Sequence, residues 1–77
     1  MEKENKYTTS DLYLTAYLKL KGFKMSVEKN NKKATFIFDR NDEIIKAVTD
    51  YLNESGDCEP LLYANSIKNL KNLLYNL

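Results

Sequence analysis

The chain has 77 residues, a hydrophobic share of 43% and a formal net charge of +1. This length corresponds to one small domain with too little interior for a deep enzymatic cleft, and the apolar share excludes a disordered segment. The near-balanced charge is also unlike that of a protein built to neutralise many phosphates. We expect a mobile polar tail over residues 1–6 and a single globular domain over residues 7–77.

The cysteine and histidine counts and the lengths of the apolar runs exclude several kinds of site. Cys58 is the only cysteine and the chain has no histidine. An intramolecular disulfide and a zinc site of the usual kind are therefore excluded, and a reducing compartment is favoured. No apolar run approaches the roughly 20 residues that cross a bilayer. We expect a cytoplasmic protein with no membrane association, no metal and no cofactor.

The first helix is predicted over Thr9–Lys21. Thr8 is the expected N-cap, because Asp11 then falls at the third helical position and favours the helix N-terminus. Gly22 is expected to end the helix in a left-handed conformation, with Phe23 folding back on Leu18.

Most of the circumference of this helix is apolar. Its polar positions, Asp11, Thr15 and Lys19, form one narrow stripe at i,i+4 spacing. A helix of this kind needs partners on more than one side. We therefore expect weak self-association into a homodimer, with Tyr13 and Tyr17 near the contact.

A β-hairpin follows the first helix. If Asn30 and Asn31 form a two-residue turn, Phe23 pairs with Phe38, Met25 with Phe36, and Val27 with Ala34. All six apolar side chains then share one face of the hairpin, and polar pairs occupy the other.

Two more helices complete the predicted fold. The second runs over Asp42–Asn53 with Asn41 as N-cap and Gly56 ending the segment, and the third begins at Pro60 and ends near Asn76. The expected core stripe of the third helix contains Tyr63, Ile67, Leu70, Leu73, Leu74 and Leu77. The predicted fold class is α+β in the order α-β-β-α-α, with a two-stranded antiparallel hairpin packed on three helices.

Five segments resemble a known family of small proteins. They are Tyr7–Leu14 (YTTSDLYL), Leu18–Phe23 (LKLKGF), Phe36–Phe38 (FIF), Leu62–Ile67 (LYANSI) and Leu73–Asn76 (LLYN). The chain is similar here to uncharacterised proteins of about 75 residues from Firmicutes and their phages. The resemblance implies a phage or mobile-element context, and it implies no activity and no catalytic residue.

The residues offer little for catalysis. Without histidine the usual general base near neutral pH is missing, and Cys58 and Ser10 have no evident activating partner. The carboxylates Glu43, Asp50 and Glu54 outline the polar side of the second helix, which favours a solvated face over a magnesium site. We therefore expect no enzyme.

Two polar features could bind nucleic acid. Asparagines repeat along the third helix at i, i+4, i+7 and i+11, flanked by two lysines, and asparagine can pair with adenine in a major groove. These residues are Asn65, Asn69, Asn72 and Asn76, with Lys68 and Lys71. The hairpin tip carries Lys29, Lys32 and Lys33, which could contact phosphates or protect the hairpin from edge pairing. We favour a solvated helix face and a protected hairpin.

The tyrosines favour a protein-binding function. Tyrosine is enriched where an apolar body meets a polar tip, and Tyr13, Tyr17 and Tyr75 are the three most expected to meet a partner. The leading hypothesis is a non-enzymatic phage or mobile-element protein that binds another protein, such as a host defence complex that it inhibits. The alternative is a nucleic-acid-binding accessory protein that uses the third helix and the hairpin tip.

Overall fold

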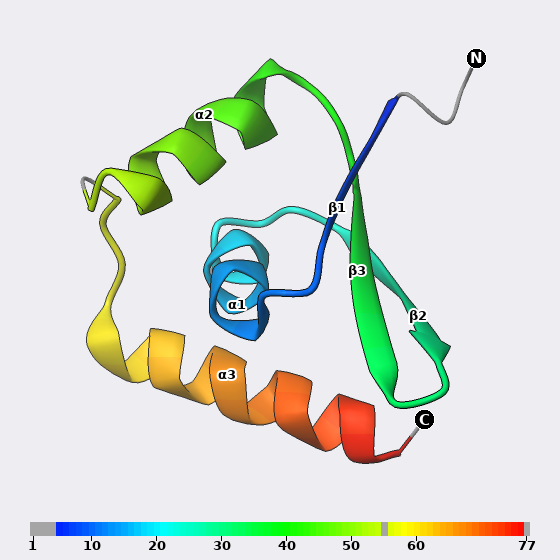
Figure 1. Ribbon diagram of the computed structural model, residues 1–77. Helices are drawn as coiled ribbons and strands as arrows, with labels where there is room; N and C mark the ends of the chain where they lie inside the picture. The colour runs from blue at the N-terminus through cyan, green and yellow to red at the C-terminus, as the bar shows by residue number, and fades with distance from the viewer. Residues whose placement is uncertain (1–4, 55, 77) are drawn as a thin grey trace.

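The computed structural model describes residues 5–54 and 56–76, and in this part of the chain three helices lie on one face of a three-stranded antiparallel sheet (Figure 1). The elements are β1 (Lys6–Thr9), α1 (Leu12–Leu20), β2 (Met25–Asn30), β3 (Lys33–Asp39), α2 (Asp42–Leu52) and α3 (Pro60–Tyr75). The α+β class is confirmed. The expected two-stranded sheet is wrong, because a third strand precedes the first helix and the sheet order is β1-β3-β2.

Strand β1 includes Lys6, which was expected in the polar tail, and Thr8 and Thr9, which were expected to start the first helix. It pairs antiparallel with β3, with Lys6 opposite Asp39 and Thr9 opposite Phe36. The Lys6 ammonium lies 2.8 Å from a carboxylate oxygen of Asp39 and lowers the pKa of that carboxyl group. The outer edge of β3 has unpaired backbone groups, and the β-branched Thr8 and Thr9 favour a strand that pairs with them. Lys6 is the first residue of this strand and therefore belongs to the sheet. Residues 1–4 of the expected tail lie outside the described residues.

The beginning of α1 differs from the prediction, and its end agrees with it. Asp11, not Thr8, is the N-cap, since its carboxylate accepts the backbone N–H groups of Tyr13 at 3.0 Å and Leu14 at 3.2 Å. Gly22 has a φ of +99°, as expected.

The C-terminal cap of α1 is a Schellman motif, as predicted. The backbone N–H of Phe23 donates to the carbonyl of Leu18 at 3.1 Å, and the N–H of Gly22 donates to Lys19 at 3.0 Å.

The hairpin register is shifted by two residues from the predicted one. Met25 pairs with Phe38, Val27 with Phe36, and Lys29 with Ala34, so that Asn31 and Lys32 form the turn. Asn31 takes the positive φ, +59°. Because a shift of two preserves strand alternation, the predicted apolar face is retained although the predicted pairs are wrong. The main consequence is that Lys29 lies opposite Ala34, on the helix-facing side, instead of opposite Lys32.

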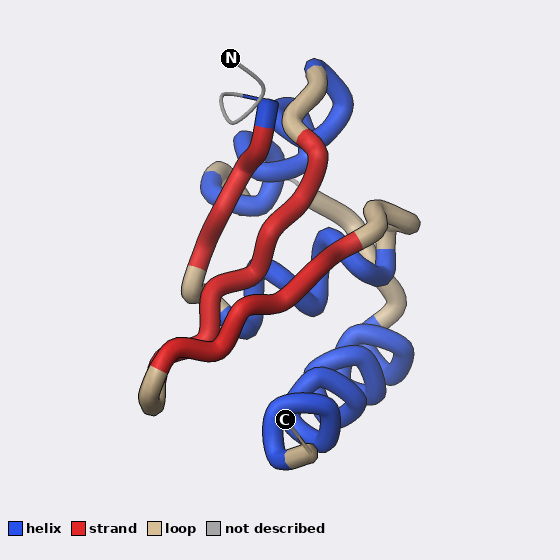
Figure 2. Tube along the Cα trace, turned by 90° about the vertical axis from the view of Figure 1, so that its right-hand side faces the viewer, coloured by secondary structure: helices blue, strands red, loops and turns tan. Residues whose placement is uncertain are grey.

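Helix α1 is the centre of the fold. In Figure 1 it is seen nearly end-on, with the sheet on one side and α2 and α3 on two others. Its residues Leu14–Leu18 are all buried, and they include Thr15, which was expected in a polar stripe. The apolar circumference that suggested self-association is therefore covered within one chain. Figure 2 shows the opposite face of the sheet, over which no helix of the described chain lies.

The other two helices begin at local signals in the sequence. The side chain of Asn41 accepts the N–H of Ile44 at 2.9 Å, and the carboxylate of Glu59 accepts the N–H of Leu62 at 2.8 Å, directly before Pro60.

The predicted core stripe of α3 is partly retained. Leu70 is buried, Leu73 is exposed, and Leu77 lies outside the described residues. None of the helices in the described chain combines the length and the apolar character that a membrane crossing needs.

Candidate functional site

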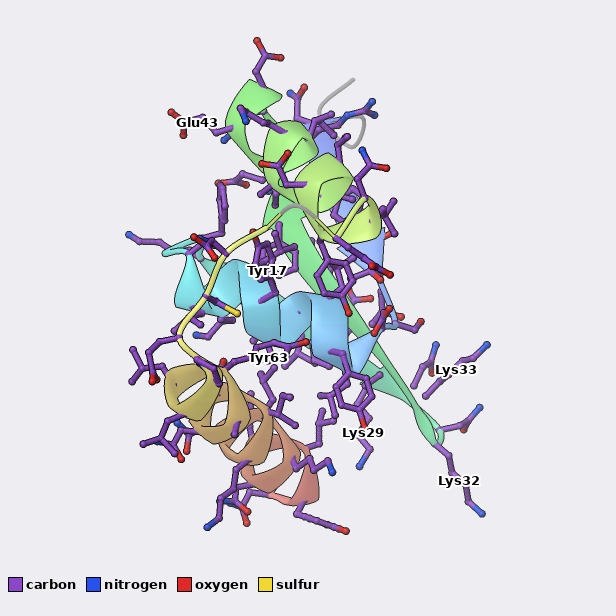
Figure 3. All side chains as sticks on the ribbon, turned by 90° about the vertical axis from the view of Figure 1, so that its left-hand side faces the viewer. Tyr17, Lys29, Lys32, Lys33, Glu43 and Tyr63 are labelled. Atoms are coloured by element: carbon purple, nitrogen blue, oxygen red, sulfur yellow. The ribbon has the colours of Figure 1, made fainter. Side chains whose placement is uncertain are left out.

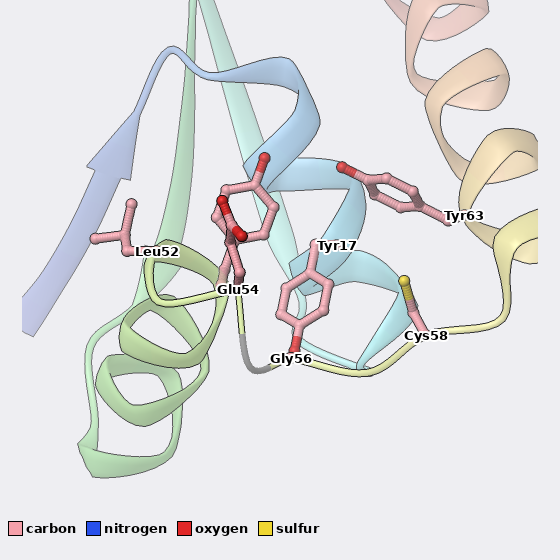
Figure 4. Close-up of a pocket in the computed structure, with 7 residues that line it drawn as sticks. Tyr17, Leu52, Glu54, Gly56, Cys58 and Tyr63 are labelled. Carbon is pink, nitrogen blue, oxygen red and sulfur yellow. The ribbon is translucent and has the colours of Figure 1, made fainter.

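A groove opens where the middle of α1, the end of α2 and the segment leading to α3 meet (Figure 4). We call it the tyrosine groove. Its volume is about 520 Å³, within the usual range of ligand sites. It is lined by Tyr17, Tyr51, Leu52, Glu54, Gly56, Cys58 and Tyr63.

The floor of the tyrosine groove is Tyr17, which is only 4% exposed. Its ring centroid lies 5.4 Å from that of Tyr51 on α2, at an interplanar angle of 44°. On another side the Lys21 ammonium lies 5.4 Å from the centre of the Tyr17 ring. The same ammonium donates a hydrogen bond to the carbonyl of Asp57. Aromatic and cation contacts thus connect three separate segments around one ring.

Gly56 forms the wall next to the Tyr17 hydroxyl. A Cβ atom at this position would lie 2.2 Å from the hydroxyl oxygen and 2.7 Å from Cζ. The backbone N–H of Gly56 donates to the carbonyl of Asp50 at 3.1 Å. Gly56 was expected to end the second helix, but the left-handed residue after α2 is Glu54, with a φ of +58°. The role of this glycine is therefore close approach to a tyrosine.

Tyr63 connects α3 to α1 at the far side of the groove. Its hydroxyl donates a hydrogen bond of 3.0 Å to the backbone carbonyl of Tyr13, and one turn later the Ser66 hydroxyl donates to the carbonyl of Ala16 at 3.0 Å. Burial raises the pKa of the Tyr63 phenol, and the neighbouring Tyr51 raises it further. The phenol therefore remains a neutral hydrogen-bond donor well above neutral pH.

The segment that forms α2 and leads to α3 is acidic, and Glu54 from this segment lines the groove. Residues 42–59 contain six carboxylates and one lysine. The carboxylates belong to Asp42, Glu43, Asp50, Glu54, Asp57 and Glu59. Within residues 5–54 and 56–76, no group of three or more histidine, cysteine, aspartate or glutamate side chains is placed to hold a metal ion. Cys58 is a half-buried free thiol on the groove wall.

The three tyrosines expected at a partner interface lie in different environments. Tyr13 is half exposed at the start of α1, and Tyr75 is 86% exposed at the end of α3. Tyr17 lies beneath the groove instead of on the surface, because the rest of the chain covers α1. Tyr13 and Tyr17 are therefore not side by side on one free helix face.

The asparagine face of α3 is exposed, together with its flanking lysines. It contains Asn65, Asn69, Asn72 and Asn76, with Lys68 and Lys71 beside it. The three lysines of the hairpin tip do not act as one group. Figure 3 shows Lys29 on the α3 side of the hairpin, Lys33 on the other side and Lys32 at the tip.

The structure brings the hairpin tip and the end of α3 together around a second hollow, of about 370 Å³. We call it the lysine hollow. It is lined by Lys29, Lys32, Ala34, Lys71, Leu74 and Tyr75. The predicted register did not bring these residues together, because it paired Ala34 with Val27. The sequence did contain one signal, since Lys29 continues the alternation of Met25 and Val27 toward the helix side.

The opposite charges of the chain are separated in space. The acidic segment 42–59 forms α2 and the wall of the tyrosine groove, whereas five lysines belong to the hairpin tip and the second half of α3. These lysines are Lys29, Lys32, Lys33, Lys68 and Lys71. The protein therefore has an acidic end and a basic end.

Comparison with known proteins identifies a family and no individual relative. The model of a domain of unknown function, DUF5659, matches residues 4–76. No curated protein and no solved structure matches the chain. Since the family model covers nearly the whole sequence, the chain belongs to the DUF5659 family.

Proposed function

We propose that this protein is a non-enzymatic interaction protein that binds another protein through the tyrosine groove. The observation that supports this proposal is the exposure of Leu52 on the wall of the groove. Leu52, on its wall, is 69% exposed, and Leu61 and Leu62 are exposed in the first turn of α3. Exposed apolar side chains beside a concave aromatic surface are typical of partner sites.

The charge around the groove indicates the chemistry of the partner. Glu54 lines the groove, and the segment 42–59 to which it belongs contains six carboxylates and one lysine, so this side of the protein attracts a basic surface. The complementary partner presents an apolar side chain for the groove and lysine or arginine at the rim. A second copy of this chain is one such partner, since its basic end would complement the acidic end.

The sequence resemblance supports the biological context that we propose. Over the five segments described above the chain resembles small proteins of Firmicutes and their phages, and we therefore propose a phage or mobile-element origin. An inhibitor of a host defence complex is one role that such a binding protein would have.

A second candidate is a nucleic-acid-binding accessory protein. The expected elements were the asparagine face of α3 and the hairpin tip. The observation that favours this candidate is the meeting of Lys29, Lys32 and Lys71 in one hollow. Binding of duplex DNA in the major groove would rely on Asn65, Asn69 and Asn72. Their exposure permits contact with DNA but does not by itself supply sequence specificity.

Site-specific photo-cross-linking in cells that carry the gene tests the protein-binding role. A photoreactive residue replaces Leu52 or Leu62, and matched controls replace Ser26 or Thr35 on the open face of the sheet. We expect a discrete protein adduct from positions 52 and 62 and none from the controls. An adduct with a second copy would identify the homodimer as the partner complex.

Introducing a charge on the wall of the groove should abolish partner binding. Leu52→Glu should abolish the adduct formed at position 62, whereas Leu73→Glu, on an exposed turn of α3 outside the groove, should leave it unchanged. Adducts that form equally at all positions, or that persist in Leu52→Glu, would contradict the proposal.

A further inference from the structure

We propose that the lysine hollow is a binding site for single-stranded nucleic acid. One base stacks on Tyr75, and neighbouring phosphates lie against Lys29, Lys32 and Lys71. This inference concerns a site distinct from the tyrosine groove and does not depend on the protein-binding role.

The two walls of the hollow come from segments that are far apart in the sequence. On the hairpin, Lys29 lies opposite Ala34 on the helix-facing side, and Lys32 belongs to the turn. On α3, Lys71 and Tyr75 are four residues apart and therefore lie on the same side of the helix. The aromatic ring and three ammonium groups thus share one concave surface.

Every charged side chain that lines the hollow is positive. No carboxylate belongs to its lining, and in the described part of the chain no ion pair involves Lys29, Lys32 or Lys71. The nearest acidic neighbour in sequence, Glu28, lies on the opposite face of the sheet because strand side chains alternate. Three ammonium groups around one hollow, none of them in an ion pair with a described residue, attract a polyanion.

Tyr75 distinguishes a nucleic acid from other polyanions. Its side chain is 86% exposed, and the adjoining Leu74 and Ala34 are half-buried in the same lining. An exposed ring next to lysines is the combination by which proteins hold single strands, since every base has a face that stacks. Acidic peptides and inorganic polyphosphate have charge but no such face.

The position of the ring also favours a single strand over a duplex. From about 100° of rotation per residue, Lys71 and Tyr75 are turned roughly 100° from the centre of the asparagine stripe on α3. The lysine hollow and the stripe therefore face different directions. A duplex presents base edges in its grooves and keeps base faces stacked, so only an unpaired base can stack on Tyr75.

Fluorescence anisotropy with a labelled 12-nucleotide oligothymidine tests this site on the full chain. We expect a Kd of about 10⁻⁴–10⁻⁶ M at physiological salt, the range of sequence-independent binding. Three phosphate contacts predict a slope of about −2 for log K against log salt, since each phosphate on a single strand contributes roughly −0.7. An abasic strand of equal length should bind more weakly, because it keeps the phosphates and lacks the bases.

Variants separate stacking from charge. Tyr75→Ala should weaken binding about 5- to 150-fold, the effect of losing one stacked base, while Tyr75→Phe should retain it. Lys29→Gln with Lys71→Gln should make the salt slope less negative by about 1.4. The matched control is Lys19→Gln with Lys24→Gln, which removes the same charge outside the hollow. It should leave the salt slope at the wild-type value.

Several results would overturn the proposal. Equal affinity for the abasic strand, for inorganic polyphosphate or for an acidic peptide would show that no base is recognised. Tighter binding of a 12-base-pair duplex would favour the asparagine face of α3. Absence of binding at low salt, or binding that Tyr75→Ala leaves unchanged, would exclude the site. Circular dichroism of each variant shows that it is folded, so that loss of binding is not loss of structure.

Discussion

The backbone of Gly56 lies so close to the Tyr17 hydroxyl that a Cβ atom there would approach the oxygen to 2.2 Å. The tyrosine cannot move aside easily, because it is 4% exposed and its ring contacts Tyr51 and Lys21. The close approach holds the segment before α3 against the central helix. It therefore shapes the tyrosine groove as well as the fold.

Gly56→Ala should lower the free energy of unfolding by about 1–3 kcal/mol, the usual cost of overpacking. For a domain of this size that is a fall in Tm of about 4–8 °C per kcal/mol, measured by thermal denaturation. The loss should be smaller in a Tyr17→Phe background, which removes the closest atom and keeps the ring.

Gly22→Ala is the matched control for that prediction. A Cβ atom at Gly22 has no neighbour within 4 Å, so its cost of about 1–3 kcal/mol comes from the φ of +99° alone. Tyr17→Phe should not alter it. An equal cost of Gly56→Ala in both backgrounds would show that the hydroxyl contact does not limit this position.

The stability of the protein should fall at alkaline pH through Tyr63. Its pKa is raised in the folded state, so the folded protein holds the phenolic proton that the unfolded chain begins to release near pH 10. The stabilisation is complete below that pH and is lost as the pH rises through the folded pKa. Urea unfolding at pH 9 and pH 11 measures the change.

Tyr63→Phe should remove this part of the pH dependence. At neutral pH it should also cost about 0.5–1.5 kcal/mol, because the hydrogen bond to the Tyr13 carbonyl is lost. Tyr75→Phe, which changes an exposed phenol, serves as the control and should retain the wild-type difference between pH 9 and pH 11. A Tyr63→Phe protein with the same difference as wild type would contradict the assignment.

Thr15→Val should stabilise the protein. Thr15 is fully buried on α1, and its hydroxyl oxygen has no hydrogen-bond partner among residues 5–54 and 56–76. Valine has nearly the same shape and removes the unsatisfied polar group, which should contribute about 1–3 kcal/mol in denaturant unfolding. Thr15→Ser keeps the hydroxyl, loses the methyl group and should be destabilising. A less stable Thr15→Val protein would indicate that the hydroxyl has a partner in solution.

Engineered disulfides distinguish the observed hairpin register from the one predicted by an Asn30–Asn31 turn. In a Cys58→Ser background, Glu28→Cys with Thr35→Cys should form a disulfide under mild oxidation, because these residues are direct cross-strand partners on the open face. Glu28→Cys with Lys33→Cys should not, since a two-residue offset places the Cα atoms beyond disulfide reach. Mass spectrometry after thiol alkylation reads the outcome. Efficient oxidation of the second pair alone would support the other register.

The end of α1, the starts of α2 and α3 and the strand faces could be predicted from the sequence because short-range interactions decide them. The N-cap of Asn41 and the glycine stop at Gly22 involve backbone groups within a few residues of one another. The apolar face of the hairpin follows from alternation, which a register shift of two residues leaves unchanged. Pro60 marked the start of α3 for the same local reason.

Other features depended on residues far apart in the sequence. Residues 7–9 could begin a helix or form a strand, and pairing with β3, about thirty residues later, decided for the strand. Thr15 looked polar and exposed until packing enclosed α1 on several sides. The two candidate sites have the same origin: Gly56 meets Tyr17, and Lys71 meets Lys29, only after the chain has folded. Local spacing determines which elements form, whereas the free energy gained by burying their apolar faces together determines which surfaces meet.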